Sequence, residues 1–160
     1  MENLRATFEE WGFRRVRTYV QSGNVIFETE KTSPDDLAPI IAEKISKEFG
    51  FSIPVVLRTS DDIGRIMRDN PFLNRKRLDH SKLHVTFLSA LPAKDAEEKL
   101  DKLNALPDEF RVKRREIYLY CPNGYGRSKL SNTALEKQLS LGATTRNWKT
   151  ANALAGISSE

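Results

Sequence analysis

The segment Arg14–Glu28, which reads RRVRTYVQSGNVIFE, decides the fold of the first half of the chain. Residues 14–20 alternate like a strand with one buried face, and Asn24–Glu28 is a second apolar run of strand length. Ser22-Gly23 between the two runs is typical of a two-residue turn, because glycine adopts a positive φ without strain. We therefore predict a β-hairpin with Gly23 at a positive φ.

A helix is predicted on each side of this hairpin. Before it, apolar residues recur at helical spacing over 4–11, and Gly12 follows as a stop signal. After it, Ser33 supplies a capping hydroxyl and Pro34 suits a first turn. An apolar stripe then continues to Gly50, which is typical of a helix end.

Ile53–Arg58 is predicted to be a strand, and Ser60 to cap a short helix that stops before Asn70-Pro71. The second half repeats part of this order. It predicts a strand over 82–89, a helix over 94–106, strands over 110–115 and 116–121, a helix from the cap Thr133 through Leu139, and a last helix capped by Thr144 or Thr145. Strands therefore alternate with helices in both halves.

This order indicates an α+β protein built from two split-βαβ, ferredoxin-like halves with antiparallel sheets. Residues 1–78 would form the first half, and residues 79–160 the second half with its basic C-terminal helices. The first half lacks its opening strand, because its first element is a helix. A missing strand leaves a sheet edge that another chain can complete. We expect the two halves to pack as one compact unit.

Composition excludes several classes of protein. Hydrophobic residues make up 39% of the 160 and charged residues 30%, which is typical of a globular chain rather than a disordered one. Apolar runs such as Ile53–Leu57 are too short to cross a bilayer. The opening residues 1–11 are acidic and amphipathic, unlike a signal peptide. The single cysteine, Cys121, forms no internal disulfide, so we expect a cytoplasmic location.

Positive charge is concentrated in the second half. The formal net charge is +4, and residues 111–149 hold nine lysines and arginines against two acids, Glu116 and Glu136. Such a stretch attracts phosphates, nucleic acids or acidic protein surfaces. A solvated basic face with no partner is the alternative interpretation, since runs of surface charge are common.

Two segments of this stretch are the best candidates for a binding site. Gly124–Lys129 is a loop with hydroxyls and cations ahead of a helix, and Thr144–Lys149 is a predicted helix start with two cations in its first turn. The helix dipole disfavours cations there by about 0.3–1 kcal/mol each, so we expect an anion between them. We predict one anion site formed by Arg127, Ser128, Lys129, Thr145, Arg146 and Lys149. In the alternative interpretation the arginines pair with internal carboxylates, and Asn132 and Asn147 tie loops together.

Metal binding and nucleophilic catalysis have weaker support. His80, His84 and Cys121 have no ligand spacing to one another, so no metal site and no cofactor are predicted. No set of serine, histidine and acid has a recognisable spacing, although such sets assemble in space. The paired carboxylates Asp35-Asp36 begin a predicted helix, where the dipole accounts for them.

Four stretches, in order, resemble one bacterial family, DUF1697, a domain of unknown function. They are Gly12-Phe13 with Val16–Phe27, then Asn70–Phe72, Gly126–Asn132 and Ala143–Trp148. The resemblance covers nearly the whole chain. It implies no reaction, ligand or catalytic residue, because the family has no established function.

The sequence departs from that family at its start. Members usually open with a strand and a glycine-rich turn, similar to Leu-Arg-Gly-Ile-Asn-Val-Gly-Gly, ahead of the first helix. This sequence has Met1 where that helix begins. The resemblance therefore implies the same missing strand as the order of elements does. A truncated start and a variant with an altered sheet both stay open.

Three functions follow from these observations. The first is a binding module for a phosphate-bearing ligand, nucleic acid included, at the basic segments. The second is an enzyme that acts on a small nucleotide or phosphorylated substrate, with Ser128, Lys129 or Tyr125 as acid or base groups. The third is a protein-interaction domain that offers its open sheet edge to another chain.

Overall fold

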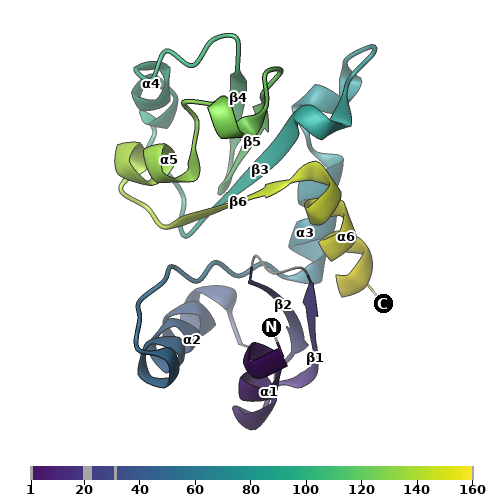
Figure 1. Cartoon of the computed structure of the whole chain (residues 1–160), viewed down its shortest axis with the longest axis vertical. Coiled ribbons are helices and arrows are strands. Elements are labelled where there is room, and N and C mark those ends of the chain that lie inside the picture. Colours follow the sequence, from purple (N-terminus) through teal and green to yellow (C-terminus); the bar gives the residue numbers. More distant parts are fainter. Residues whose placement is uncertain (1, 20–22, 31, 160) are drawn as a thin grey trace.

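The computed structural model describes residues 2–19, 23–30 and 32–159 as two units stacked along the longest axis of the molecule (Figure 1). One unit contains a two-stranded sheet and the other a four-stranded sheet, and both sheets are antiparallel. The prediction of an α+β fold with antiparallel sheets is confirmed. Of the helices in these ranges, none is long and apolar enough to cross a membrane.

The four-stranded sheet has the split-βαβ topology. Its strands, in spatial order, are β4 (Glu109–Lys113), β5 (Glu116–Tyr120), β3 (Leu83–Leu88) and β6 (Ala143–Asn147). Every neighbouring pair is antiparallel. The helix α4 (Ala96–Asp101) connects β3 to β4, and α5 (Asn132–Leu139) connects β5 to β6. The first strand of this unit, β3, therefore lies in the interior of its sheet.

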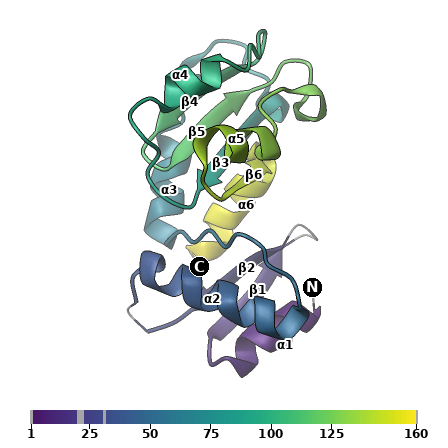
Figure 2. The same ribbon diagram turned by 90° about the vertical axis from the view of Figure 1, so that its left-hand side faces the viewer.

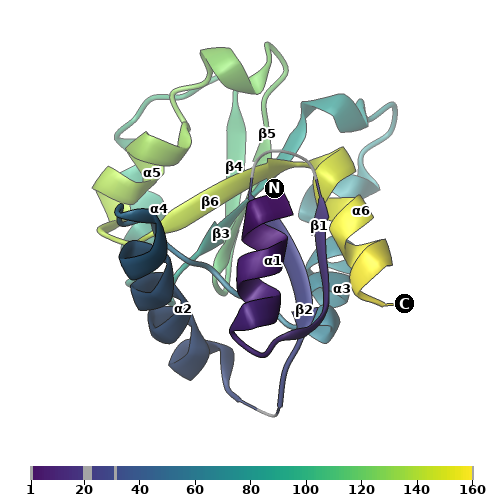
Figure 3. The same cartoon turned by 60° about the horizontal axis from the view of Figure 1, so that its bottom comes forward.

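Helices cover both faces of this sheet (Figures 1 and 3). α4 and α5 pack on the face that carries Leu88. The other face, which carries Val85, is covered by α3 (Ser60–Arg68) and α6 (Trp148–Ser158). Trp148 is buried in that second layer together with Ala151 of the same helix. Consecutive residues of a strand in this sheet thus point into two different layers.

The first unit is a hairpin backed by two helices. Its elements, in chain order, are α1 (Glu2–Glu10), β1 (Arg14–Tyr19), β2 (Asn24–Glu28) and α2 (Pro34–Phe49). As predicted, the Ser33 hydroxyl caps α2 by accepting a 3.2 Å hydrogen bond from the N–H of Asp35. Gly50 ends the helix with a φ of 78°. Apolar side chains of all four elements form one core between the helices and the hairpin.

The predicted hairpin is present. β1 and β2 pair antiparallel, with Tyr19 opposite Asn24. Gly23 has a φ of 83°, as its place in the turn predicts. Residues 20–22 lie outside the described ranges, so the type of turn stays a prediction.

The predicted strand over Ile53–Arg58 is wrong, because residues 51–59 belong to neither sheet. The side chains nevertheless alternate as in a strand. Val55 and Leu57 join the core of the first unit, whereas Val56 packs against the core of the second. In the four-stranded sheet the closing strand β6 pairs only with β3, the first strand of its unit. By the order of elements, the segment 53–58 is the counterpart of that closing strand, and among the described residues no strand lies between it and β2.

The helix start predicted at 144–145 is also wrong. Ala143–Asn147 forms β6, and α6 begins at Trp148 with Asn147 as its N-cap. The Asn147 side chain accepts a 2.8 Å hydrogen bond from the N–H of Thr150. β-branched threonines favour a strand and asparagine is a strong N-cap, which together explain this boundary.

Three further boundaries differ from the sequence prediction. Thr59 rather than Ser60 caps α3, and it exchanges reciprocal hydrogen bonds with Asp62. Ser131 rather than Thr133 caps α5. In both cases the earlier hydroxyl residue has the extended backbone that a cap requires. α4 covers only part of the predicted helix over 94–106. Short 3₁₀ helices span Pro71–Asn74, His80–Lys82 and Tyr125–Arg127.

Candidate binding cleft

A cleft of about 700 Å³ lies where the first unit meets the second. One wall is β2 with residues next to it, and the opposite wall is the segment 56–60. Residues of β3, β6 and α6 close the cleft from the second unit. Figure 2 shows the hairpin, the segment that leads from α2 to α3, and the end of α6 gathered in this region. The lining includes five arginines, namely Arg14, Arg15, Arg17, Arg58 and Arg146.

The two walls present their side chains as neighbouring strands would. On β2, Phe27 faces the core of the first unit, and Asn24 faces the second unit, where it accepts a 2.7 Å hydrogen bond from Nε of Arg146. On the other wall, Leu57 faces the first core and Arg58 faces the second unit. A strand between the walls would thus have one side toward the first core and one toward the second unit.

The four-stranded sheet shows which strand this position corresponds to. β3 pairs with β5 on one side and with β6 on the other. By the order of elements, β2 is the counterpart of β5, and residues 53–58 are the counterpart of β6. The cleft is therefore the counterpart of β3, a strand with all but one of its residues buried.

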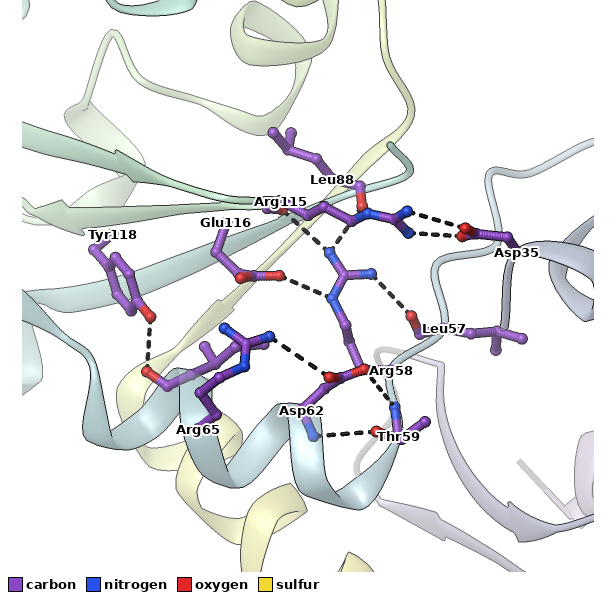
Figure 4. Close-up of polar contacts among 11 residues, drawn as sticks. Asp35, Leu57, Arg58, Thr59, Asp62, Arg65, Leu88, Arg115, Glu116 and Tyr118 are labelled. Carbon is purple, nitrogen blue, oxygen red and sulfur yellow. Dashed lines mark hydrogen bonds and ion pairs between the residues drawn. The ribbon is translucent and has the colours of Figure 1, made fainter. Parts of the chain in front are cut away.

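Arg58 fixes one wall of the cleft, the segment 56–60, to the four-stranded sheet (Figure 4). This wall is called the outer wall below. Its Nε donates a 2.9 Å hydrogen bond to the carboxylate of Glu116, and its Nη2 donates to the carbonyls of Leu88 at 2.8 Å and Arg115 at 3.1 Å. The side chains of Arg58 and Glu116 are only 8% and 2% exposed. Burial raises the pKa of Glu116, and Arg58 opposes this rise by stabilising the carboxylate. Each charge compensates the other in a buried place.

A second ion pair joins the units at the surface (Figure 4). The guanidinium of Arg115 donates to both carboxylate oxygens of Asp35, at 2.6 and 3.0 Å. Arg115 holds the pKa of the Asp35 carboxyl below its usual value. Because Asp35 is exposed, this pair is screened by solvent and positions α2 more than it stabilises the fold.

Two arginines link the other wall, which is β2 with the residues next to it and is called the inner wall below, to the second unit. Arg146, on β6, makes the bond to Asn24 described above and also donates to the hydroxyl of Thr144 at 2.5 Å. Arg17, on β1, donates from Nη2 to the carbonyl of Ile157 in α6 at 3.0 Å. Burial lowers the pKa of Arg146. Positive charge at a partly buried cleft attracts a negatively charged group more strongly than the same charge in water.

Of the six residues predicted to form one anion site, Thr145 and Arg146 lie on opposite faces of the four-stranded sheet. The hydroxyl of Thr145 contacts that of Thr86 at 2.7 Å and donates to Asn132 of α5 at 3.0 Å. Arg146 follows Thr145 on the strand, lies opposite Val85 and faces the first unit. Thr145 and Arg146 therefore point in opposite directions, because successive strand residues alternate.

The other four residues lie in loops and helix ends. Arg127, Ser128 and Lys129 precede α5, and the Ser128 hydroxyl accepts a 3.0 Å hydrogen bond from the N–H of Leu130. Arg127 and Lys129 are exposed, as is Lys149 in the first turn of α6. Of the six, Arg146 lines the cleft, Thr145 faces away from it toward α5, and convergence of the other four on Arg146 stays a prediction.

Asn132 and Asn147 tie elements together, which accounts for part of the C-terminal motifs. The Asn132 amide donates to the carbonyl of Ala143 at 3.0 Å and to the carboxylate of Glu136 at 3.1 Å. Glu136 in turn accepts from the N–H of Ala143 at 3.3 Å. These bonds hold α5 to the start of β6, while Asn147 caps α6.

Cys121 and His84 lie away from the cleft. Burial raises the pKa of the Cys121 thiol to about 11, so the thiol is neutral at pH 7 and a poor nucleophile. Burial lowers the pKa of His84, whose ring stacks on Tyr125 with centroids 4.6 Å apart. Within the described ranges, no group of three histidines, cysteines or acids could hold a metal ion.

Comparison with known sequences decides the family. A family model described as "Protein of unknown function (DUF1697)" matches residues 1–118. The chain belongs to the DUF1697 family. The resemblance to this family is confirmed over those residues, which include two of the four sequence stretches, the one that begins at Gly12 and Asn70–Phe72. No curated protein matches this DUF1697 chain.

The fold of this DUF1697 chain is similar to that of a solved bacterial protein. The structure of conserved bacterial protein SP0830 from Streptococcus pneumoniae superposes with a TM-score of 0.67 and 16% sequence identity, over 99% of this chain and 88% of that one. At that identity the likeness shows a shared fold.

Sequence reasoning found Arg146 but missed the rest of the cleft. Arg14, Arg17 and Arg58 lie in segments predicted as strands, and their positions there gave no sign of a site. One signal would have found them. The sequence predicts that the opening strand of the first half is missing. In a split-βαβ sheet that strand would lie between β2 and residues 53–58, so its empty place predicts the cleft.

Proposed function

We propose that this DUF1697 chain is a binding module whose first sheet accepts an extended segment of a partner polypeptide as an added strand. One observation carries the proposal: a cleft occupies the place in the first sheet that β3 occupies in the second. Domains that bind in this way use main-chain hydrogen bonds for affinity and side-chain pockets for specificity.

Both walls of the cleft are suited to backbone pairing. β2 pairs with β1 on its other side, and residues 51–59 belong to no ladder. Ordering a partner strand costs about 1–2 kcal/mol per residue, while burial of each apolar side chain contributes about 1.5–3 kcal/mol. Burial of a few side chains alone therefore does not offset the cost of ordering the strand, and main-chain hydrogen bonds are needed as well. A strand in the cleft can form these bonds with two walls rather than one.

The test uses a neutral peptide of alternating valine and threonine, with the six residues of β3 as its length. We expect saturable binding by fluorescence anisotropy and slower hydrogen exchange of β2 and residues 55–58 in the complex. Ser158→Trp places a bulky ring in the lining of the cleft and should weaken binding at least tenfold, which is about 1.4 kcal/mol.

The matched control is Ser159→Trp, because Ser159 is the exposed neighbour and is not among the lining residues. It should bind the peptide like the unmodified chain. Absence of saturable binding, or equal weakening by both substitutions, would overturn the proposal.

A second candidate is binding of a phosphate-bearing ligand, nucleic acid included. The charge of the cleft favours it, because the described residues of the lining include five arginines and two acids, Glu28 and Glu30. Glu28 pairs with Arg15, and Arg58 pairs with Glu116. Arg146 and Thr144 would donate to the phosphate, and charge-assisted hydrogen bonds contribute about 1.5–3 kcal/mol each. Arg127, Ser128, Lys129 and Lys149 would extend this candidate over the basic surface, whereas Thr145 faces α5.

Titration with a nucleoside triphosphate and with a single-stranded oligonucleotide tests this candidate. Affinity should fall steeply as salt is added, because phosphate contacts release counterions. Arg146→Gln should weaken binding, and Arg127→Gln should do so too if the loop before α5 contributes to the same site. Binding that is insensitive to salt and to Arg146→Gln would rule the candidate out.

The lining of the cleft favours binding over catalysis. The described residues that form it include no lysine, histidine or cysteine. Guanidinium groups hold an anion but stay protonated, so they transfer no proton at neutral pH. The acid and base groups of the enzyme hypothesis, Ser128, Lys129 and Tyr125, lie before α5 instead.

A further inference from the structure

Both sides of the cleft present apolar side chains, and this inference rests on the proposed function. A strand between β2 and residues 55–58 would point its side chains alternately toward the first unit and toward the second. On the side of the first unit it would meet Phe27, Leu37 and Leu57, which line the cleft and belong to the core of that unit. Every second residue of such a strand therefore needs an apolar side chain.

The side that faces the second unit is also apolar where the strand would lie. Ile26 of β2 stands between Val25 and Phe27, which face the first core, so its side chain faces the second unit. Val56 has the same orientation on the outer wall and packs against the core of the second unit. Phe87 of β3 belongs to that core and lines the cleft too. The remaining residues of the strand therefore meet apolar groups as well.

The arginines on this side are bonded within the protein. Arg58 is paired with Glu116, and both side chains are buried. Arg146 donates to Asn24, and Arg17 donates to a carbonyl of α6. These groups need no charge on the partner. The apolar side chains of the cleft are therefore what selects the strand that enters it.

The composition of β3 shows what a place between two such walls selects. Four of its six residues are leucine, valine or phenylalanine and are at most 5% exposed. Thr86, which is buried as well, has its hydroxyl bonded to that of Thr145. Strands buried on both faces are near-continuous apolar runs, whereas strands with one wet face alternate apolar and polar residues. A strand in the cleft is expected to be of the first kind.

The second unit also indicates the direction of the strand. There α5 connects β5 to β6, and both of these strands are antiparallel to β3 between them. In the first unit α2 makes the same connection from β2 to residues 53–58. A strand in the position between them is therefore expected to run antiparallel to β2, with its N-terminal end near Glu28 and its C-terminal end near Asn24.

We propose that the partner segment is a continuous apolar run, of the length of the six-residue strand β3, that runs antiparallel to β2 and buries side chains on both of its faces. Runs of this kind lie inside folded proteins. The partner therefore offers one in a segment that is not part of its own folded core.

Three peptides with the same glycine–serine flanks test this composition. In six central positions the first alternates valine with threonine, the second has valine throughout, and the third is the first with one central threonine replaced by glutamate. Whichever register the alternating peptide takes, all its threonines face one side of the cleft. Because burial of an unpaired hydroxyl is costly, the all-valine peptide should bind at least about tenfold more tightly in fluorescence anisotropy. The glutamate peptide should bind more weakly than both.

The side that faces the second unit is tested by Ile26→Thr. This substitution places a hydroxyl beside the strand, so the advantage of the all-valine peptide over the alternating one should shrink. Ile40→Thr is the matched control, because Ile40 is 47% exposed on α2 and is not among the described residues of the lining. It should keep the full advantage. An unchanged advantage in Ile26→Thr would show that the strand does not meet this side.

Direction is measured on the complex with the all-valine peptide by nuclear magnetic resonance. A nitroxide at the N-terminus of the peptide should broaden the amide signals of Glu28 and Thr29. A nitroxide at the C-terminus should broaden that of Asn24 instead. The reverse pattern would overturn the antiparallel assignment.

Failure of this inference is distinguishable from failure of the proposed function. If the alternating peptide binds and the all-valine peptide binds no more tightly, or the glutamate peptide binds best, the doubly apolar partner is wrong and strand binding stands. If no peptide binds, both are wrong. A chain that dimerises by itself, and becomes monomeric with Ser158→Trp, would show that a second copy fills the cleft and would overturn the separate partner.

Discussion

Arg58 is the residue on which the position of the outer cleft wall depends. Its guanidinium donates to Glu116 and to the carbonyls of Leu57, Leu88 and Arg115, so its charge is matched and its donors are used in a buried place. Such a pair adds little stability compared with apolar side chains of the same size. Its value here is positional, because it ties the segment before α3 to the turn between β4 and β5.

We expect Arg58→Met to lower the free energy of unfolding by about 3–5 kcal/mol, because it leaves the Glu116 carboxylate buried and uncompensated. Urea denaturation measures the change. Adding Glu116→Gln should recover a large part of the loss. Arg115→Met is the control, since its partner Asp35 is exposed, and its effect should be much smaller. Equal losses for the two arginines would show that burial of the pair is irrelevant.

At single residues, backbone conformation set by local turn chemistry could be predicted from the sequence, but the direction in which a strand side chain points could not. The positive φ of Gly23 follows from turn chemistry within a few residues, and the structure has it. The direction of Arg146 depends on the register of β6 against β3, which joins residues far apart in the chain. The neighbours of Arg146 in the sequence carry no information on that register. The sequence therefore predicts one anion site for Arg146 and Thr145, although Thr145 points to the opposite face.

At the scale of elements, both ends of α2 were predicted correctly, whereas the N-caps of α3, α5 and α6 were predicted at the wrong residues. Ser33 and Gly50 bound α2 as predicted, since a hydroxyl before a proline and a glycine after a stripe are strong local signals. The segment 53–58 has the alternation of a strand but forms none. Pairing is a property of two segments, and the part of the chain that the structure describes places no strand beside residues 53–58.

The N-cap of α6 gives a prediction at this scale. Asn147→Ala should lower the free energy of unfolding by about 1 kcal/mol, because the N–H of Thr150 loses its acceptor at the start of the helix. Thermal or urea denaturation measures it. Asn147→Asp keeps an acceptor and adds a charge that the helix dipole favours, so it should retain full stability. A loss of the same size for aspartate would mean that the side chain does not act as a cap.

At the scale of the whole molecule, the two units differ in how fully their sheets are paired. β3 has a neighbour on each side, β2 has one, and residues 51–59 have none. Backbone amides outside a ladder exchange through smaller openings than those in the centre of a sheet. The stability of the molecule should therefore be uneven.

Hydrogen exchange followed by mass spectrometry tests this unevenness. Peptides that cover residues 51–59 should take up deuterium well before those that cover β3, and β2 should fall between them. Equal protection of residues 51–59 and β3 would mean that the cleft wall is held by contacts as strong as a two-sided ladder.

The contacts between the units also impose an order in time. Asn24 is synthesised 122 residues before its partner Arg146, and Arg17 is synthesised 140 residues before its partner Ile157. A ribosome adds about 5–20 residues per second, so the hairpin emerges roughly 6–28 seconds before these partners exist. During that interval the face of β1 and β2 that α6 will cover is open to chaperones at the exit tunnel. Slower translation of the last quarter of the message would lengthen this exposure without changing a single residue.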